Sequence, residues 1–591
     1  MTADLCIAGG GMAGVCAALA AARHGARVVL LQDRSVLGGN ASSEIRMHMV
    51  GASCSGRRPG ARESGLIEEI RLEDAVRNPD RSPALFDLLL YDLVRREPNI
   101  TLLLDTVCTA CEVEDGFIRR VRAVRHSTED EFWIEARFFA DCTGDSRLGR
   151  EAGAGFRMGR EARAEFGEPD APEIADARTL GSTILFMAKE TGAPVPFTAP
   201  PWARRFTDEQ LKLRSHREFE YGYWWMEWGG QLDTIKDGDR IRHELLAIAL
   251  GVWDHVKNHC TQPPDPSAAY EKWMDGATPE ARGAERWRLD WVGMLPGKRE
   301  SRRLLGPVIL TEHDILGARL WPDTVAYGGW WIDLHPPAGV DAAAEYPCRQ
   351  IETPHLYGIP LRALYSRNIA NLFMAGRNIS ATHLAFASTR VMATCAVIGQ
   401  AVGTAAALAA REGVSRADQA PVHEVQQALL RDDAFLPGVA VDDPLDLARG
   451  AAPAILTNGL TRRLTPALHP SFTAADNVWA GDTLTLRWDE PQLIEEVHLT
   501  FDTGFERELT LSMSDAFTRR MIRGPQPETV RDYEIEAGGQ RLTVTSNYLR
   551  KRTHRFTRPA ATRELAIRLG PPARLYELRV YGGCKVKERD A

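Results

Sequence analysis

The chain has 591 residues, of which 44% are hydrophobic and 26% charged, so it is not a mostly disordered protein and has room for up to four domains. Its 72 Lys and Arg against 80 Asp and Glu give a formal net charge of −8 at pH 7. This mild acidity argues against general binding to nucleic acid or anionic membranes and favours a small-molecule partner.

The N-terminus and the cysteines indicate the compartment. Asp4 stands where a secretory signal would carry basic residues, and the longest apolar stretch, 391–408, is interrupted by glycine, threonine and glutamine. Ten cysteines spread over the whole chain fit reduced thiols better than a disulfide framework. The sequence therefore predicts a cytoplasmic protein that does not contact a membrane.

A glycine motif follows the first predicted strand. Residues 4–8 have a buried-strand pattern, 9–14 read Gly-Gly-Gly-Met-Ala-Gly, and an alanine-rich helix continues to about residue 24. Strand, glycine turn and helix in this order are typical of a dinucleotide site, where the backbone approaches a pyrophosphate at the positive end of the helix. The next strand ends at Gln32 and Asp33, where an acidic residue normally holds the ribose hydroxyls.

Composition divides the chain into four stretches. Residues 1–158 alternate short apolar runs with helical patterns, which predicts a parallel sheet with crossover helices. Residues 159–352 are richer in Trp, Pro and charge. Residues 353–440 return to strand and helix character, and their first part, up to Arg411, holds five arginines and no acid, which favours a bound polyanion. Residues 441–591 have short alternating runs typical of a linker and an all-β sandwich.

Three further motifs lie at 37–46, 138–145 and 371–380. With the first glycine motif they resemble the FAD motifs of the glutathione-reductase-like fold, in the same order. Together with 296–303 and 375–403 they resemble the bacterial FAD-dependent oxidoreductase family, which is distantly related to fumarate reductases and to the flavin subunit of heterodisulfide reductase. The resemblance covers about residues 1–440.

This resemblance implies one discontinuous α/β Rossmann-type FAD-binding domain, because the motifs are split between 1–158 and 353–440. Residues 159–352 are then an α+β substrate or cap domain, and 441–591 resemble a discoidin or galactose-binding-like β-sandwich. FAD is the implied cofactor, and no metal site is expected. The residues expected to bind FAD are Gly9, Gly11, Met12, Ala13, Gly14, Gln32, Asp33, Arg34, Gly38, Gly39, Asn40, Ser43, Glu44, Arg46, Val107, Thr143, Gly144, Asp145, Arg299, Gly376, Arg377, Arg390 and Val391.

Two histidines are the candidates for proton transfer. His383 lies between the last FAD-like strand and the helix after it, and imidazole is suited to deprotonating an alcohol. It could equally cap its loop. His48 follows the second glycine motif and could line the pocket or, as in the fumarate-reductase group that the chain distantly resembles, carry a covalent flavin link.

Aromatic clusters at 221–228 and 328–335 suit stacking on a sugar ring, with Glu227, Asp333 and His335 available for its hydroxyls. The alternative is an aromatic core strand. A basic cluster at 298–303 could bind an anion or the flavin, or form a salt-bridged turn. The residues predicted to bind substrate are Trp224, Trp225, Trp228, Trp330 and Arg302.

The leading hypothesis is an FAD-dependent oxidoreductase that transfers hydride from a secondary alcohol carbon of a carbohydrate or glycoside to flavin N5 and passes the electrons to an unknown acceptor. Its variant is a redox-neutral elimination from a transiently oxidised sugar. A reductase of activated alkenes and a sugar-binding protein with a structural flavin are the other classes considered. A homo-oligomer is possible.

Overall fold

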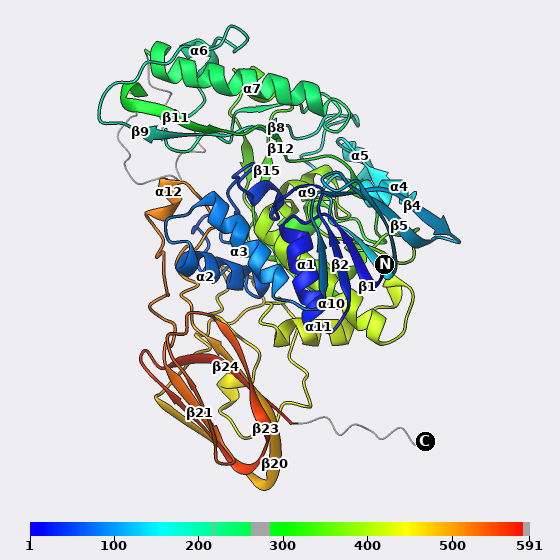
Figure 1. Ribbon diagram of the computed structural model, residues 1–591, viewed down its shortest axis with the longest axis vertical. Helices are drawn as coiled ribbons and strands as arrows, with labels where there is room; N and C mark the ends of the chain where they lie inside the picture. The colour runs from blue at the N-terminus through cyan, green and yellow to red at the C-terminus, as the bar shows by residue number, and fades with distance from the viewer. Residues whose placement is uncertain (217–218, 262–283, 583–591) are drawn as a thin grey trace.

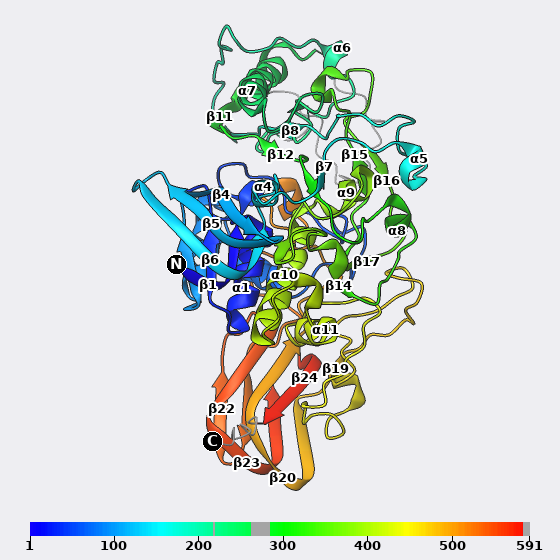
Figure 2. The same cartoon turned by 90° about the vertical axis from the view of Figure 1, so that its right-hand side faces the viewer.

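The computed structural model describes residues 1–216, 219–261 and 284–582. They form three parts along the long axis of Figure 1. The cap, at the top, consists of α7 with strands β8 to β12. The central part surrounds a mainly parallel sheet, and the C-terminal sheet lies at the bottom. Figure 2 shows the same order after a quarter turn, with α10 to the right of the central sheet.

The central sheet has the order β3-β2-β1-β6-β5-β4, and β18 also pairs with β6. Strands β1, β2, β3, β6 and β18 pair in parallel, and β4 and β5 extend the sheet in antiparallel fashion. This topology confirms the predicted Rossmann-type α/β fold. The strands are β1 (Thr2–Ala8), β2 (Val28–Leu31), β3 (Ile100–Leu103), β4 (Thr106–Glu114), β5 (Phe117–Arg125), β6 (Asp130–Asp141) and β18 (Leu372–Met374).

Helices cover this sheet and lie close together where glycines allow it. Gly399 and Gly403 of α10 face α1, and a Cβ on either would lie 2.1 Å from a carbonyl oxygen of Ala13 or Ala17. Among the described helices, α10 is long and apolar enough to cross a membrane, but 94% of its apolar window is buried inside the protein. The helices of this part are α1 (Met12–Arg23), α2 (Leu66–Arg77), α3 (Pro83–Arg95), α4 (Arg147–Glu151), α9 (His383–Thr389), α10 (Met392–Arg411) and α11 (Val422–Arg431).

The cap and the region beneath it are built from small sheets. In the cap, β8 lies between β10 and β12, and β11 pairs with β9. Below them β14 pairs with β17 and β15 with β16, and β13 pairs with β7. The elements are β7 (Phe156–Arg157), α5 (Arg163–Phe166), β8 (Ser182–Thr183), β9 (Phe186–Glu190), α6 (Asp208–Leu211), β10 (Glu227–Trp228), α7 (Gly238–Asp254), β11 (Trp287–Val292), β12 (Gly297–Lys298), β13 (Arg303–Leu304), α8 (Glu312–Leu316), β14 (Thr324–Gly328), β15 (Ile332–Leu334), β16 (Arg349–Ile351) and β17 (Tyr357–Pro360).

The C-terminal region is all-β, as predicted, and forms one antiparallel sheet of six strands in the order β19-β24-β20-β23-β21-β22. The long strands β20 and β23 change register twice along their pairing. The strands are β19 (Trp479–Ala480), β20 (Thr483–Phe501), β21 (Tyr533–Ala537), β22 (Gln540–Val544), β23 (Lys551–Leu569) and β24 (Arg574–Gly582).

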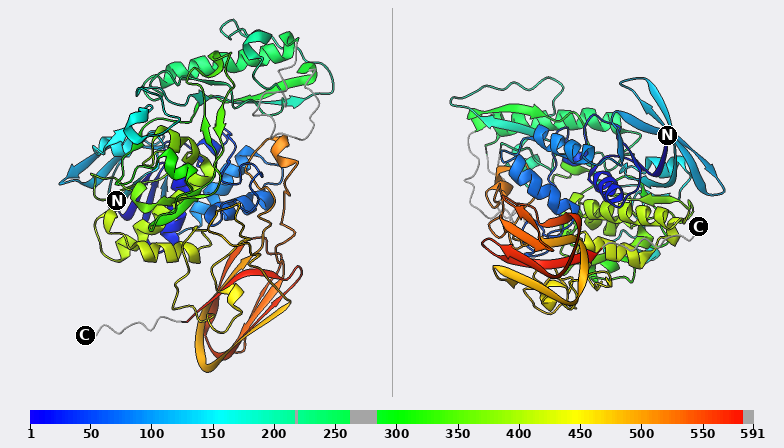
Figure 3. Two further views of the ribbon diagram at one scale, coloured as in Figure 1. Left: turned by 180° about the vertical axis from the view of Figure 1, so that it is seen from behind. Right: turned by 60° about the horizontal axis from the view of Figure 1, so that its bottom comes forward.

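A long connection leaves this sheet and returns to the rest of the molecule. We call residues 502–532, between β20 and β21, the bridging segment. It carries α12 (Asp515–Thr518), which lies beside α3 and below the cap in Figure 1 and stays next to them in the views of Figure 3. The amide of Met49 donates to the carbonyl of Leu511 at 2.9 Å, so the segment pairs directly with the chain beyond the second glycine motif.

Candidate active site

A cavity of about 670 Å³ opens between the central sheet and the cap. Its floor is made by the glycine turns after β1 and β2, and its far wall by residues of the cap. It lies at the carboxyl ends of the parallel strands, where open α/β sheets bind ligands. One wall residue, Phe517, comes from α12 of the bridging segment, so all three parts of the molecule contribute to the cavity.

Glycines line the floor because two backbone segments approach each other there. Gly9 has φ +101°, and a Cβ on it would lie 2.4 Å from the carbonyl oxygen of Cys142. Gly11 and Gly38 form an isolated bridge. The space above Gly11 is open, since the nearest atom to an added Cβ would be Cα of Gly39 at 3.9 Å. A bare backbone therefore faces the cavity at Gly11, as close approach to a pyrophosphate requires.

Two helices begin at this cavity. Gly11 and Val391 are the N-caps of α1 and α10, neither N-cap makes a side-chain capping bond, and neither first turn contains an acid. Met12, Ala13 and Met392 of these first turns line the cavity. Free N–H groups and the positive end of a helix attract negative charge. The α1 end fits the pyrophosphate of FAD, and the α10 end fits the flavin ring, which gains negative charge on reduction.

The ribose contact is better placed on Asp33 than on Gln32. The side-chain amide of Gln32 is already bonded, since its Oε1 accepts from the Gly10 amide at 2.8 Å and its Nε2 donates to the Val36 carbonyl at 2.9 Å. Asp33 also lines the cavity, and its side chain is 55% exposed. Its carboxylate is available to the ribose hydroxyls, whereas Gln32 shapes the glycine turn.

Asp145 joins three of the predicted motifs. Its carboxylate accepts from Lys298 Nζ at 2.6 Å, from Arg377 Nη2 at 2.7 Å and from Ser301 Oγ at 2.8 Å. Burial raises the pKa of Asp145, but the charges of Arg377 and Lys298 outweigh burial and hold that pKa well below its usual value. The group stays ionised and fixes both cations at the cavity wall.

A histidine between two carboxylates lies on the cap side of the cavity. Nδ1 of His335 is 2.7 Å from Glu227 Oε2, and Nε2 is 3.0 Å from Asp333 Oδ2. Arg390 Nη2 is 3.1 Å from the same Nε2 and 3.0 Å from Asp333 Oδ2. Because carboxylates only accept, Nδ1 donates to Glu227, while Nε2 faces one acceptor and one donor. Nε2 can accept from Arg390 when it is neutral and donate to Asp333 when it is protonated, so it has a partner in either state.

The two carboxylates around His335 remain ionised. Burial raises the pKa of Glu227, but the charge of Arg299 and the hydrogen bond from His335 outweigh it, so this pKa is lowered. His335 and Arg390 likewise lower the pKa of Asp333 against the effect of burial. A histidine held by ionised carboxylates is oriented and is stabilised when it gains a proton.

Short strand pairings set this geometry. Asp333 on β15 is directly opposite Gln350 on β16, and Gln350 Nε2 lies 3.3 Å from Asp333 Oδ1. Glu227 begins β10, which pairs with β8, and Arg299 follows β12 on the other side of β8. Arg299 donates to Thr183 Oγ1 of β8 at 2.6 Å. The β10-β8-β12 sheet thus carries one half of the cluster and the β15-β16 pair the other.

Most of the sequence-predicted residues line this cavity. They are Gly9, Gly11, Met12, Ala13, Gln32, Asp33, Arg34, Gly38, Gly39, Asn40, His48, Val107, Thr143, Gly144, Asp145, Trp224, Arg299, Arg302, Trp330, Gly376, Arg377, Arg390 and Val391.

Seven predicted residues do not line the cavity: Gly14, Ser43, Glu44, Arg46, Trp225, Trp228 and His383. Gly14 packs the first turn of α1 onto the glycine loop, since a Cβ there would lie 1.8 Å from the Gly9 carbonyl oxygen. Arg46 lies over the ring of Trp291, 3.9 Å from its centroid. Trp225 is a core residue, because it is 2% exposed and stacked on Tyr223. This agrees with the alternative interpretation of the aromatic clusters, an aromatic core strand.

His383 lies in a buried ion-pair network outside the cavity. Its backbone amide donates to Glu161 at 2.8 Å, and its Nδ1 is 3.0 Å from Glu300, which also pairs with Arg303. Glu300 and Arg303 have no exposed surface. His383 is the first residue of α9, so these contacts fix the start of the helix to the chain after β12. They give His383 a structural role that needs no contact with substrate or flavin.

His48 lines the cavity as a neutral side chain. Its Nδ1 is 2.7 Å from Ser512 Oγ of the bridging segment, and its ring stacks on Tyr221 with centroids 4.5 Å apart. Burial lowers its pKa to about 3. The contact with Ser512 fixes the orientation of the ring. A hydroxyl carries no negative charge, so unlike a carboxylate it does not stabilise a protonated imidazole.

Sequence reasoning missed some cavity residues. Phe517 and Gln350 line the cavity without any motif around them, and Lys236 and Arg242 reach it from the start of α7. Asp333 and His335 were named only as possible hydroxyl contacts. Their alternation on either side of Leu334 was the available signal, because residues two apart on a strand point to the same face.

The cofactor class follows from one comparison with known proteins. The family model described as FAD dependent oxidoreductase matches residues 4–429. No curated protein matches this chain. Among solved structures, L-proline dehydrogenase from P. horikoshii is 21% identical over 24% of this chain and 23% of its own, with a TM-score of 0.16. This match spans about a quarter of either chain.

Two other solved structures match over more of their length. A geranylgeranyl bacteriochlorophyll reductase-like protein from Thermoplasma acidophilum is 11% identical over 73% of this chain and 87% of its own, with a TM-score of 0.33. The E. coli quinol fumarate reductase FrdA is 16% identical over 73% of this chain and 74% of its own, with a TM-score of 0.28.

Proposed function

This chain belongs to the FAD dependent oxidoreductase family and is therefore an FAD enzyme with a small-molecule substrate and an electron acceptor; from this premise we propose that it oxidises a secondary alcohol of a carbohydrate or glycoside, with His335 as the proton acceptor. Bound FAD would supply the chemistry of accepting a hydride from carbon. The observation that carries the proposal is the cluster of Glu227, His335, Asp333 and Arg390 beside the glycine-lined cavity.

His335 suits the removal of a hydroxyl proton. Glu227 fixes the ring through Nδ1, Nε2 lies beside Asp333 and Arg390, and His335, Asp333 and Arg390 all line the cavity. When Nε2 takes a proton, the new N–H is stabilised by Asp333 at 3.0 Å, and the ionised pair of carboxylates balances the imidazolium charge. A general base of this kind contributes roughly 10²–10⁴-fold to a rate.

The walls around His335 suit a polyhydroxylated ring. Trp224 and Trp330 line the cavity and offer aromatic faces, and Trp224 stands edge-on to the His335 ring with centroids 5.4 Å apart. Within the described residues, the buried Nε1 of Trp330 has no hydrogen-bond partner and could donate to a hydroxyl. Gln350 and Arg390 add polar groups on the same side. Apolar faces with a few convergent polar groups are typical of sugar sites.

The test is anaerobic reduction of the bound flavin by a panel of glycosides, followed by its absorbance. We expect at least one glycoside to bleach the flavin, and we expect His335→Asn to slow this step by about 100-fold or more with the flavin still bound. His423→Asn is the matched control, because His423 is 58% exposed and lies on α11. Oxidation of the prereduced enzyme by fumarate-like alkenes, with no bleaching by any glycoside, would contradict the proposal.

A second measurement separates net oxidation from the redox-neutral variant. Product is analysed under anaerobic conditions without added acceptor. We expect one equivalent of oxidised product per flavin, because without an acceptor the reduced flavin is not reoxidised. Many turnovers under these conditions would show that the hydride returns to the product and would replace net oxidation by elimination.

A further inference from the structure

A second group of reactive side chains lies in the cap, away from the cavity. His216, His255 and Cys260 offer ligand atoms that all lie within 4.8 Å of one another. None of the three lines the cavity. His216 is 5% exposed and His255 is 1% exposed, so both imidazoles are withdrawn from water. The sequence does not predict a metal here, because the three residues do not form a compact motif.

The backbone after α7 brings two of these residues to the same side. Residues His255–His259 form a π-helical turn, in which the Cys260 amide donates to the His255 carbonyl at 2.7 Å. In an α-helix, positions five apart point about 140° away from each other. The wider π turn places them one above the other, and such turns are frequent at functional sites.

The imidazoles are prepared as ligands. His255 Nδ1 lies 3.1 Å from the Phe206 carbonyl and donates to it, which leaves the lone pair on Nε2. Within the described part of the chain, this buried Nε2 makes no hydrogen bond, although the Asp208 carboxylate lies 3.3 Å from it. A lone pair that no backbone contact occupies is what a metal ion requires of an imidazole ligand.

Two separations in this group match those of a tetrahedral zinc site. Zn–S near 2.3 Å and Zn–N near 2.0 Å place sulfur and nitrogen ligands about 3.6 Å apart, and nitrogen and oxygen ligands about 3.3 Å apart. Cys260 Sγ is 3.7 Å from His216 Nδ1. Asp208 Oδ1 is 3.3 Å from His255 Nε2. Two edges of the tetrahedron are thus already present, one on each side of the site.

We propose that His216, His255 and Cys260 bind a zinc ion, and that the carboxylate of Asp208, which lies beside His255, moves onto the ion as the fourth ligand. Mixed nitrogen and sulfur ligands favour zinc over magnesium or calcium, and four protein ligands characterise a structural rather than a catalytic zinc site. The ion would fasten the end of α7 to the chain around α6. It would stabilise the cap, which carries Glu227 and Trp224 of the active site.

The test uses the flavin-loaded full chain. Its zinc content is measured by mass spectrometry after purification without chelators, and the chelator-treated protein is then titrated with Zn²⁺ by calorimetry. We expect one zinc per chain and a melting temperature that falls on chelation and recovers with Zn²⁺. Cys260→Ser should weaken binding by more than about 100-fold, the upper end of what loss of an outer-shell partner costs.

Matched controls are Cys111→Ser and His243→Ala, since Cys111 is only partly buried and His243 is 68% exposed on α7. Both should bind zinc like the parent. His255→Ala tests the site a second way, and an unchanged flavin spectrum shows that a variant is folded. Absence of a saturable zinc site in the folded parent, or binding that Cys260→Ser leaves unchanged, would overturn the proposal.

Discussion

Individual glycines at the cavity have different structural roles, which substitution by alanine can distinguish. An alanine at Gly11 has room, because the nearest atom to its Cβ would be 3.9 Å away, and its φ of −67° suits any residue. The added methyl would stand where the backbone should meet a pyrophosphate. We expect Gly11→Ala to keep its secondary structure and to weaken FAD binding at least about tenfold, roughly 1.4 kcal/mol.

Flavin fluorescence during dilution measures this affinity, and circular dichroism measures the fold. Gly192→Ala is the control, because a Cβ at Gly192 meets no atom within 4 Å. Gly14→Ala should behave differently from Gly11→Ala, since its Cβ would collide with the Gly9 carbonyl and disturb the turn itself. Equal FAD affinity in Gly11→Ala and the parent would show that the pyrophosphate does not approach this glycine.

The residue scale also shows where sequence reasoning reached its limit. Glycine motifs can be recognised in a sequence, because only glycine permits the close approach that the fold requires. The side chains that transfer protons cannot be recognised in this way. His383 and His335 each sit beside a carboxylate, but long-range contacts with Glu300 and Glu227 decide which ring faces the cavity. Those contacts join positions 83 and 108 residues apart, so no local pattern encodes them.

Among elements, the bridging segment links the C-terminal sheet to the substrate side of the cavity. Arg81, beside α3, is 2.5 Å from Asp515 at the start of α12, and the Asp515 amide donates to Glu220 at 2.6 Å. These contacts hold Phe517 at the cavity wall. We expect Phe517→Ala to raise KM for the substrate severalfold with FAD content unchanged. The substitution widens the cavity at the wall formed by α12 and leaves the glycine turns, where FAD is expected to bind, unaltered.

Steady-state kinetics and the flavin absorbance of the purified variant check this expectation. Ile174→Ala serves as the control, since Ile174 is an apolar residue that is 80% exposed. A loss of FAD in Phe517→Ala, or unchanged KM, would mean that α12 does not shape the substrate side. The sequence could predict the strands around this segment from their alternation, but not that the segment between them returns to the cavity.

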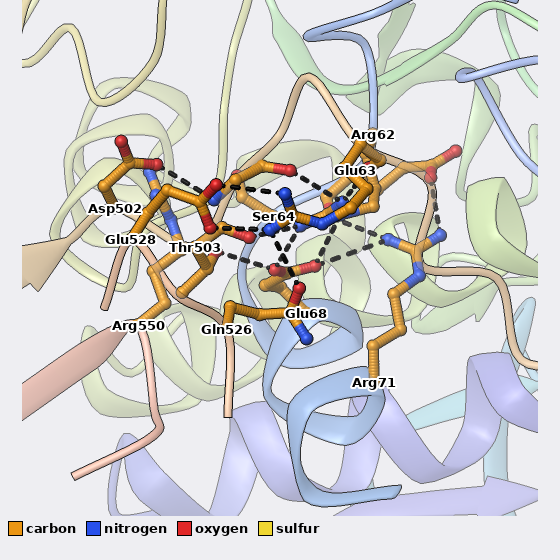
Figure 4. A network of polar contacts seen from close by, with 12 residues as sticks. Arg62, Glu63, Ser64, Glu68, Arg71, Asp502, Thr503, Gln526, Glu528 and Arg550 are labelled. Atoms are coloured by element: carbon orange, nitrogen blue, oxygen red, sulfur yellow. Dashed lines mark hydrogen bonds and ion pairs between the residues drawn. The ribbon is translucent and has the colours of Figure 1, made fainter. Parts of the chain in front are cut away.

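On the scale of the whole molecule, the C-terminal sheet is fixed to the central part by buried charge. Figure 4 shows the network, in which Arg62 and Glu68 of the central part meet Thr503, which follows β20. Arg550 at the start of β23 lies nearby and donates to Asp433 of the central part at 2.8 Å. The all-β character of the region was readable from its sequence, and its galactose-binding-like resemblance stays a prediction. What the sequence could not indicate is this attachment, because of which we expect the sheet to unfold together with the central part.

Glu68 is the centre of that attachment. Its carboxylate accepts from Arg62 at 2.8 and 3.0 Å and from Thr503 Oγ1 at 2.8 Å, and Arg62 donates onward to the Thr503 carbonyl at 3.1 Å. Arg62 is 2% exposed and Glu68 has no exposed surface. Removing one charge leaves the other buried and unpaired, so we expect Glu68→Gln to lower the free energy of unfolding by about 3–5 kcal/mol.

Denaturant unfolding of the flavin-loaded protein, followed by flavin fluorescence and by far-ultraviolet dichroism, measures this loss. The matched control is Glu564→Gln, which removes the partner of Arg487 on the C-terminal sheet, where the two side chains are 52% and 75% exposed; it should cost less than about 1 kcal/mol. Because the network ties the two parts together, both signals should shift to the same lower midpoint in Glu68→Gln. If flavin release keeps the parent midpoint while dichroism reports early loss of β structure, the C-terminal sheet unfolds by itself and does not support the cavity.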